Sequence, residues 1–371
     1  MDIKVGILVP RSYTVPLITQ QIARGIKLGF EVEEVSAQFF IEDIGKAVDP
    51  DLVMAKTNNL LLNEVDLIFA MPGTKVDIPL VNLCDASKKP LIIIEAGAAI
   101  TRNDEMPFSP YVFTNSYNMW HNCILLGQYT GKFIGEKVLS TGAFFEAGYS
   151  FLPAFEYGLH KAGGIIVGSH LCKDFKPEDF TVQLADIIES VQPNVLVAFY
   201  NGKDADDFYN YAVKTGVTKN LPVVTTSLTA AAFGGEKYPL TSIWIWDGAN
   251  TNAGNKKFVN AYTAKHRAMP DEYSAISYES ALASAAAIKK VKENYFDADE
   301  FCRLLKETTV YGPRGEFSFN PETMRNYAFG TAIISNGQTV NVQFTSEDIE
   351  AAKQHFSQWP HSGWYNPYPC A

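Results

Sequence analysis

The chain alternates short apolar runs with longer stretches of helical periodicity, and the alternation occurs twice, in residues 1–117 and again in 140–230. The runs cover residues 5–10, 39–44, 66–70 and 91–95 in the first block, and 143–147, 164–168, 194–200 and 222–226 in the second. Runs of this kind, without polar alternation, are typical of parallel strands covered on both faces. The pattern predicts an α/β protein with two doubly wound parallel-sheet lobes and a ligand cleft between them.

The stretches between the runs have the spacing of amphipathic helices. In residues 16–31, Ile18, Ile22, Ile26 and Phe30 share one face, which is the apolar stripe of a helix that packs on a sheet. A helix over 119–137 opens the second block, and three more follow the last run of that block. They are expected at residues 255–268, 277–291 and 297–308.

The end of the chain changes character. Strand-like runs at 327–335 and 339–344 flank Asn336–Gly337, and an Asn-Gly pair between such runs indicates a hairpin. A further strand is expected at 243–247, where the second block is already complete.

Composition narrows the classes of function. The chain has 371 residues, enough for two domains, and its net charge of −10 argues against a nucleic-acid partner. No apolar run reaches the roughly 20 residues that span a bilayer. Strand-like sequence begins by Ile3, so an exported form is expected to have lost its signal segment. Five cysteines leave at least one thiol free, and their spacing predicts no zinc site and no particular disulfide pairing.

Ligands of open α/β sheets bind beyond the carboxyl ends of the strands, which selects particular loops here. Small and hydroxyl-bearing residues in such loops let backbone amides approach a ligand, and tyrosines add an apolar face with a polar tip. The candidate residues in these loops are Arg11, Tyr13, Thr74, Lys75, Ala96, Gly97, Ala98, Tyr149, Tyr200, Asn201 and Ser227.

Some candidates have two interpretations. Arg11 and Lys75 either bind an anion or are solvated charges. Glu95 ends a strand and either accepts hydrogen bonds from a ligand or caps a helix. Tyr117 and Asp247 lie where the chain is expected to cross between lobes, and Asp247 serves either a hinge or the ligand.

Motifs of enzymes are absent from the sequence. The first strand is not followed by G-x-G-x-x-G, and no P-loop, G-x-S-x-G or H-E-x-x-H occurs. The six histidines are scattered. We therefore expect a non-catalytic protein without cofactor or metal.

The order of these segments resembles the type I periplasmic solute-binding proteins, in particular the leucine/isoleucine/valine-binding group of ABC importers. The resemblance covers nearly the whole chain and depends on the order and spacing of loose motifs. These are residues 5–10 with the helix after them, 65–73 leading to 90–99, 111–117, 147–163, 195–202, 212–224, 312–317 and 326–334.

The resemblance implies how the chain is divided. It predicts lobe one from 1–117 plus 250–326, and lobe two from 118–246 plus 330–371. Hinge crossings are implied near 113–118, 245–250 and 326–330. It also implies an extracytoplasmic protein, periplasmic or extracellular, with a membrane tether as an alternative. Such a protein captures a small ligand between its lobes and delivers it to a membrane permease.

Two departures from the amino-acid binders concern the ligand. Ala98 stands where that group usually has a hydroxyl, and residues 225–229 contain no carboxylate to hold an ammonium group. An aromatic or aliphatic carboxylate, or another small polar compound, is therefore an alternative to an amino acid. A ligand sensor on the same fold remains the alternative to a transport protein, and an α/β enzyme is a third hypothesis.

Overall fold

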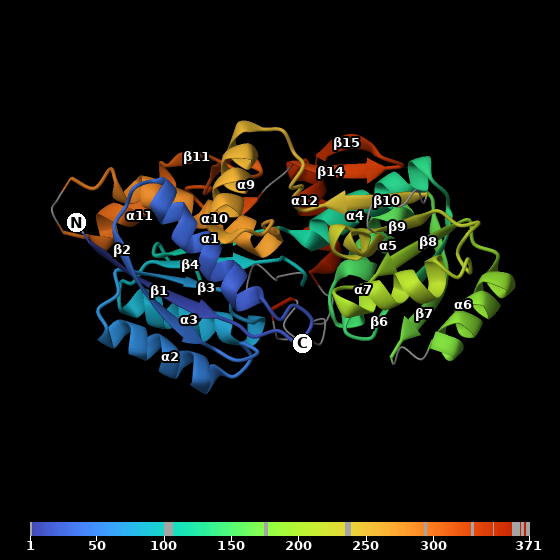
Figure 1. Ribbon diagram of the computed structural model, residues 1–371, viewed down its shortest axis with the longest axis horizontal. Coiled ribbons are helices and arrows are strands. Elements are labelled where there is room, and N and C mark those ends of the chain that lie inside the picture. Colours follow the sequence, from blue (N-terminus) through green and yellow to red (C-terminus); the bar gives the residue numbers. More distant parts are fainter. Residues whose placement is uncertain are drawn as a thin grey trace.

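The computed structural model describes residues 2–99, 107–173, 177–233, 239–292, 295–327, 330–343 and 345–357, together with Trp364, Pro367 and Tyr368. Its strands form two large sheets, which lie side by side along the long axis of the molecule (Figure 1). We call sheet A with the helices packed on it the first lobe, and sheet B with its helices the second lobe.

Sheet A has the order β13-β5-β4-β3-β1-β2, and every adjacent pair is parallel. Strands β1 to β5 therefore follow a doubly wound order. The strands are β1 (Ile3–Val9), β2 (Ala37–Asp43), β3 (Leu67–Ala70), β4 (Leu91–Glu95), β5 (Val112–Ser116) and β13 (Arg325–Tyr327). A separate hairpin, β11 (Thr309–Gly312) and β12 (Gly315–Ser318), pairs antiparallel in the same lobe.

Sheet B repeats that order. Its sequence is β15-β14-β10-β9-β8-β6-β7, with parallel pairs from β7 to β10 and antiparallel pairs at β14 and β15. The duplicated rhythm of the sequence thus corresponds to two sheets of the same winding. The strands are β6 (Lys137–Ala143), β7 (Ile165–Cys172), β8 (Val195–Phe199), β9 (Val223–Thr226), β10 (Leu240–Trp244), β14 (Gly330–Ser335) and β15 (Gln338–Gln343).

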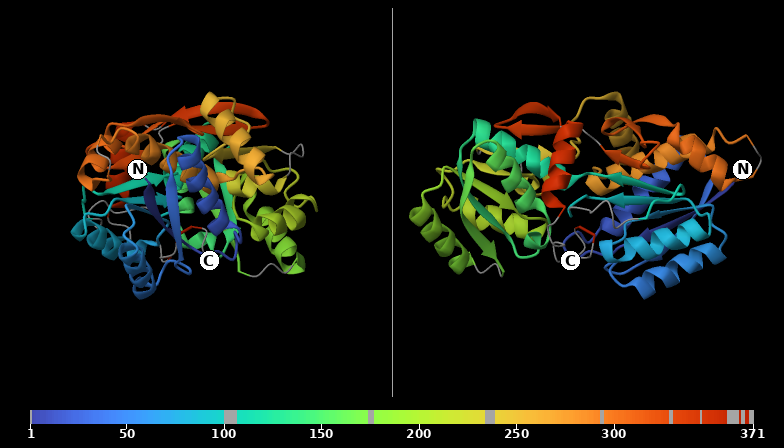
Figure 2. Two further views of the ribbon diagram at one scale, coloured as in Figure 1. Left: turned by 60° about the vertical axis from the view of Figure 1, so that its left-hand side comes forward. Right: turned by 180° about the vertical axis from the view of Figure 1, so that it is seen from behind.

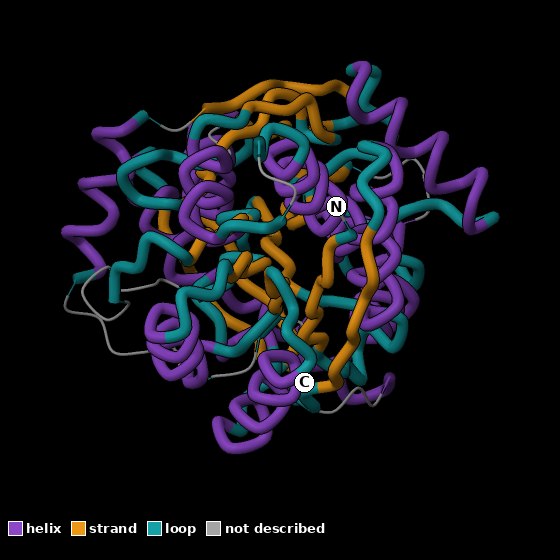
Figure 3. The backbone as a smooth tube through the Cα atoms, turned by 90° about the vertical axis from the view of Figure 1, so that its left-hand side faces the viewer, coloured by secondary structure: helices purple, strands orange, loops and turns teal. Residues whose placement is uncertain are grey.

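Helices surround the strands of both sheets (Figure 3). In the first lobe α1 packs against α10, while α2 and α3 cover the opposite face of sheet A. The helices of this lobe are α1 (Ile18–Val32), α2 (Pro50–Leu62), α3 (Thr74–Ala86), α9 (Ala253–His266), α10 (Glu272–Ile288) and α11 (Ala298–Lys306).

In the second lobe α4 packs against α5 on one face of sheet B, and α6 and α7 lie on the other. Its helices are α4 (Met119–Phe133), α5 (Phe151–Lys161), α6 (Pro177–Val191), α7 (Lys203–Phe208), α8 (Ser227–Ala230) and α12 (Ser346–Phe356), with short helical turns at Glu146–Gly148, Tyr209–Val213 and Ala231–Phe233. Seen from behind, α12 stands beside the junction of the lobes (Figure 2).

The expected fold class is confirmed, because both sheets are dominated by parallel pairs and are covered by helices. The predicted strand at 143–147 was wrong: the strand is β6, which ends at Ala143, and α4 ends at Phe133, four residues before its predicted end at 137. The hydroxyl groups of β6 concealed it. Ser140 and Thr141 are buried because their oxygens bond Ser169 at 2.7 Å and Tyr200 at 2.6 Å, so a buried strand here has a polar sequence.

Close packing of α4 on α5 depends on glycine. A Cβ atom added at Gly158 would lie 2.0 Å from the backbone oxygen of Ile124, and one at Gly127 would lie 2.0 Å from that of Phe155. These oxygens belong to helical backbone and cannot move without parting the helices. The two helices therefore approach each other backbone to backbone.

We predict that Gly158→Ala lowers the thermal unfolding temperature. Alanine favours an isolated helix by about 1 kcal/mol over glycine, but overpacking at this crossing costs about 1–3 kcal/mol. His160→Ala, on the exposed side of the same helix, is the control and should change little. An unfolding temperature that rises in Gly158→Ala would show that helix propensity outweighs the close contact.

Candidate functional site

The two lobes meet where the parallel strands of both sheets end. The carbonyl of Ala98, in the loop after β4, accepts a 2.9 Å hydrogen bond from the amide of Ser150, just before α5. On the same side, the carbonyls of Ala96 and Gly97 accept bonds of 3.1 and 2.9 Å from the amides of Met119 and Trp120. Three consecutive carbonyls of the first lobe therefore hold the second lobe.

A second approach lies across the junction. Gly202, after β8, lies so close to the loop after β1 that an added Cβ would be 2.6 Å from the backbone oxygen of Thr14. Its φ of +52° is also a conformation that glycine adopts readily. The lobes are thus in contact at the carboxyl ends of their strands, on both sides of the region between them.

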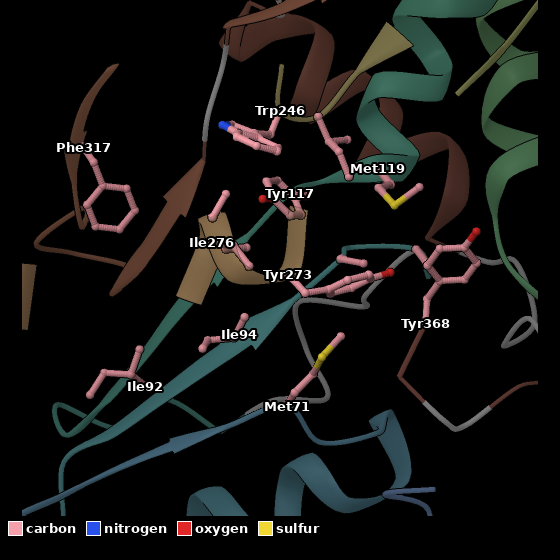
Figure 4. Close-up of a cluster of buried hydrophobic side chains, with 14 of the residues drawn as sticks. Met71, Ile92, Ile94, Tyr117, Met119, Trp246, Tyr273, Ile276, Phe317 and Tyr368 are labelled. Atoms are coloured by element: carbon pink, nitrogen blue, oxygen red, sulfur yellow. The ribbon is translucent and has the colours of Figure 1, made fainter. Parts of the chain in front are cut away.

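The space between these contacts holds large apolar side chains from both lobes (Figure 4). We call this set the interlobe cluster, and all of its members are buried. It comprises Met71 after β3, Tyr117 and Met119 at the passage from β5 to α4, Tyr149 before α5, Trp246 after β10, Tyr273 in α10 and Tyr368 near the C-terminus. The region between the lobes is therefore apolar and largely aromatic.

Beside the cluster lies a buried carboxyl group. Glu146, three residues after the end of β6, accepts a 3.1 Å hydrogen bond from the Tyr368 hydroxyl. Burial raises its pKa from 4.5 to about 8; the bond from Tyr368 opposes this shift and the charge of Asp204 adds to it. No ion pair involving Glu146 occurs among the described residues. This carboxyl group is protonated near neutral pH and can donate or accept a hydrogen bond.

Tyr117 is held in the cluster from the first lobe. Its hydroxyl donates to the backbone oxygen of Glu272, and the Arg314 guanidinium lies 4.9 Å from the centre of its ring. Arg314 is in turn paired with buried Glu279, 3.0 Å from Nε to the carboxylate, and donates to the Asn115 oxygen at 2.7 Å. The predicted candidate Tyr117 is therefore a rigid wall of the region between the lobes.

Two polar candidates of the second lobe are buried with unused hydrogen-bonding capacity. The Asn201 side-chain nitrogen and the Ser227 hydroxyl have no partner among the described residues. They follow β8 and β9, at the edge of sheet B that faces the first lobe. A buried polar atom without a partner is rare and costly, so both atoms are available to a polar group of a ligand.

Three predicted residues, Arg11, Tyr13 and Lys75, lie away from the cluster. Tyr13 is 85% exposed, and Lys75 is exposed at the start of α3, next to the half-buried Thr74. Arg11 forms an ion pair with Asp43 at the end of β2, so the alternative of a surface charge describes it. Of the first-lobe candidates, the structure brings Ala96, Gly97, Ala98 and Tyr117 to the junction.

Glu95 lies near Asp77 of α3 and Arg325 of β13. Burial raises its pKa, and Arg325 and a hydrogen bond from Ser116 oppose the shift. Its charge adds to the burial that raises the pKa of Asp77 to about 8. Arg325, together with Lys353, also lines a hollow of about 350 Å³.

Tyr200 and Asp247 have structural roles. Tyr200 belongs to the core on the far side of sheet B, where it stacks on Phe208 at 4.7 Å. The Asp247 side chain accepts from the amide of Ala249 at 2.8 Å, which orders the turn between β10 and α9. The hinge interpretation of Asp247 therefore fits its bonds.

Comparison with known proteins identifies the family. The family model described as "Periplasmic binding protein" matches residues 2–333. The chain belongs to the periplasmic binding protein family. No curated protein sequence matches it.

Solved structures show the same fold. An ABC transporter substrate-binding protein from Sphaerobacter thermophilus superimposes with a TM-score of 0.76 at 22% identity, over 93% of this chain and 97% of that one. A solute-binding protein from Rhodopseudomonas palustris BisB5, in complex with 3,4-dihydroxybenzoic acid, gives 0.73 at 22% identity over 93% and 96%. LivJ from Streptococcus pneumoniae, in complex with isoleucine, gives 0.70 at 16% identity over 93% and 99%.

The expected resemblance to periplasmic solute-binding proteins is thus confirmed. Within the described residues, none of the helices is long and apolar enough to cross a membrane, and no group of His, Cys, Asp and Glu is arranged to hold a metal ion. Cys84, Cys123, Cys172 and Cys302 are buried, and Cys370 lies outside the described residues.

Several residues of this periplasmic binding protein's interlobe region escaped sequence reasoning. Glu146 was hidden inside the wrongly placed strand at 143–147, and a correct end for β6 would have exposed it. Tyr273 starts a helix and Tyr368 lies in the C-terminal segment. Neither residue directly follows a strand, so the expectation that ligands bind beyond the carboxyl ends of strands could not identify them.

We predict that Glu146→Gln removes a pH dependence of stability. The native state keeps a proton on Glu146 between about pH 4.5 and about pH 8, where the unfolded state has lost it. Wild-type stability must therefore fall as the pH rises through this interval. The unfolding temperature of Glu146→Gln relative to wild type should rise from pH 5 to pH 8, by the equivalent of about 1–3 kcal/mol.

The other carboxyls with raised pKa, such as Asp77 and Glu272, are present in both proteins and cancel in this comparison. Glutamine also keeps an acceptor for Tyr368. A difference between the two proteins that stays constant across the interval would contradict the raised pKa of Glu146.

Proposed function

We propose that this periplasmic binding protein binds a small aromatic compound carrying a hydroxyl or carboxyl group between its lobes. The observation that carries the proposal is that the phenol side chain of Tyr368 already occupies this region. The ring of Tyr368 lies edge-on to Tyr149 and Phe151, at 4.9 and 5.1 Å, with its hydroxyl on Glu146. The region therefore has the shape and the hydrogen-bond partner for a phenol ring.

Polar atoms of the site support the same class of ligand. The unpartnered Asn201 amide and Ser227 hydroxyl can donate hydrogen bonds to a carboxylate. Neither brings a negative charge to hold an ammonium group, and Glu146 is protonated near neutral pH. Similar structures, at 17–22% identity, are in complex with 3,4-dihydroxybenzoic acid, benzoate and 4-hydroxybenzoate.

We further propose how the ligand acts on the chain. The lobes, residues 1–117 with 250–326 and 118–246 with 330–371, close on the ligand about crossings near 113–118, 245–250 and 326–330. Contacts made to both lobes at once favour the closed form over the open one. The closed protein then docks on the permease of an ABC importer outside the cytoplasmic membrane. The similarity to ABC transporter substrate-binding proteins favours this role over that of a sensor or an enzyme.

A thermal-shift and calorimetric panel tests the ligand class. Benzoate, 4-hydroxybenzoate and 3,4-dihydroxybenzoate should raise the unfolding temperature in a concentration-dependent way, because a ligand of the native state stabilises it by about 2.7 kcal/mol at one hundred times its Kd. Leucine and isoleucine should not. Stabilisation by leucine without any by the aromatic acids would refute the proposal.

Variants of the polar atoms locate the carboxylate. Asn201→Ala and Ser227→Ala should each weaken the binding of 4-hydroxybenzoate by about tenfold, the worth of one hydrogen bond to a charged group. Asn210→Ala, an exposed asparagine in the same lobe, is the matched control and should bind as wild type does. Unchanged affinity in both site variants would place the carboxylate elsewhere.

A further inference from the structure

Tyr368, near the end of the chain, lies in the region where the strands of both lobes end. Figure 4 shows the Tyr368 ring beside Tyr273 and Met119. Tyr368 is 4% exposed. Burial raises its pKa well above 10, and the neighbouring Glu146, Tyr273 and Tyr149 add to the shift. Tyr368 thus contacts the second lobe and lies near Tyr273 of the first.

Trp364 anchors this segment to the second lobe. Its indole nitrogen donates to the Phe145 backbone oxygen at 2.7 Å, and its ring stacks on that of Phe145 at 6.1 Å. Gly148 leaves room for it, since an added Cβ would lie 1.4 Å from the indole nitrogen. Trp364 therefore fixes the chain four residues before Tyr368.

Tyr368 contacts its neighbours as a bound ligand would, and those neighbours have other contacts that keep their positions. Its only hydrogen bond given by the described structure is to Glu146, a carboxyl group that gains from any donor. Its ring contacts are to Tyr149 and Phe151, whose other ring neighbours, Phe145 and Phe199, hold them in place without it. Removal of Tyr368 would leave a preformed aromatic site with a hydrogen-bonding group at its end.

We propose that Tyr368 is an internal stand-in for the ligand, which fills the aromatic site in the free protein and leaves it when the ligand binds. The inference rests on the proposed function, because it takes the ligand to be an aromatic compound bound between the lobes. A site that is empty only part of the time has its affinity reduced by the fraction of competent molecules. The occupant therefore raises the ligand concentration at which the site is half filled.

Tyr368→Ala separates this proposal from a role in the wall of the site. As a stand-in, Tyr368 competes with the ligand, so its removal should tighten the binding of 4-hydroxybenzoate by about tenfold or more. As a wall, it contacts the ligand, so its removal should weaken binding. Tyr368→Phe, which keeps the ring and loses only the bond to Glu146, should tighten binding by a smaller factor and guards against misfolding of the alanine variant. Tyr295→Ala, an exposed tyrosine, is the control.

Hydrogen exchange measured by mass spectrometry is a second readout, and it should change in opposite directions if Tyr368 is a stand-in or a wall of the site. Saturating 4-hydroxybenzoate should increase exchange in the peptide containing Trp364 and Tyr368 of the wild-type protein. Decreased exchange there, with weaker binding by Tyr368→Ala, would overturn the proposal.

The same measurements distinguish this proposal from the proposed function. If leucine binds and the aromatic acids bind neither wild type nor Tyr368→Ala, the aromatic ligand class is wrong. Tighter leucine binding by Tyr368→Ala, with increased exchange in the wild-type peptide, would then still support displacement of Tyr368. Weaker or unchanged leucine binding would overturn it.

Discussion

The arrangement of the whole molecule depends on the backbone of residues 96–98. The first amides of α4 have no partner within the helix, and Asn118 at its N-cap supplies no side-chain bond. The carbonyls of Ala96 and Gly97 accept hydrogen bonds from these amides. The next carbonyl, that of Ala98, accepts one from the amide just before α5. Because these are backbone bonds, they hold the two helices of the second lobe at a defined position over the strand ends of the first.

Glycine makes this seam feasible. Gly97 has a φ of +65°, and an added Cβ would lie 2.6 Å from the Ser116 hydroxyl and 2.7 Å from the Asn118 amide nitrogen. The loop after β4 can therefore fold against the passage from β5 to α4. On the far side of that passage, the Arg314–Glu279 pair and the Arg314–Tyr117 contact keep the crossing in place. Together these contacts fix the walls of the region between the lobes.

The chemistry of that space follows from burial more than from charge. The chain carries ten net negative charges, yet the carboxyl group beside the interlobe cluster has a pKa of about 8. Aromatic and thioether side chains exclude water, so the proton stays on Glu146 and the site presents a neutral partner. A protonated carboxyl group suits a phenol or a carboxylate better than an ammonium group, which would need its negative charge.

Much of the fold was readable from the sequence, because buried parallel strands and amphipathic helices have local signatures. The runs at 5–10, 66–70 and 91–95, and the hairpin at Asn336–Gly337, correspond to elements of the structure. Part of the candidate site was predicted from the same signatures: Tyr117, Asn201 and Ser227 are buried just after strands β5, β8 and β9. The error at β6 arose where hydroxyls, satisfied only by distant partners, give a buried strand a polar sequence.

The sequence by itself determined two doubly wound sheets and the loops at their carboxyl ends, because hydrophobic periodicity is a property of neighbouring residues. The tertiary structure alone decided which of those loops meet. The packing buries Tyr200 in the core on one face of sheet B and leaves Tyr13 in solvent. It also brings Glu146, Tyr273 and Tyr368 together from three distant parts of the chain. Contacts between residues more than a hundred positions apart depend on how the lobes pack, and no local pattern records them.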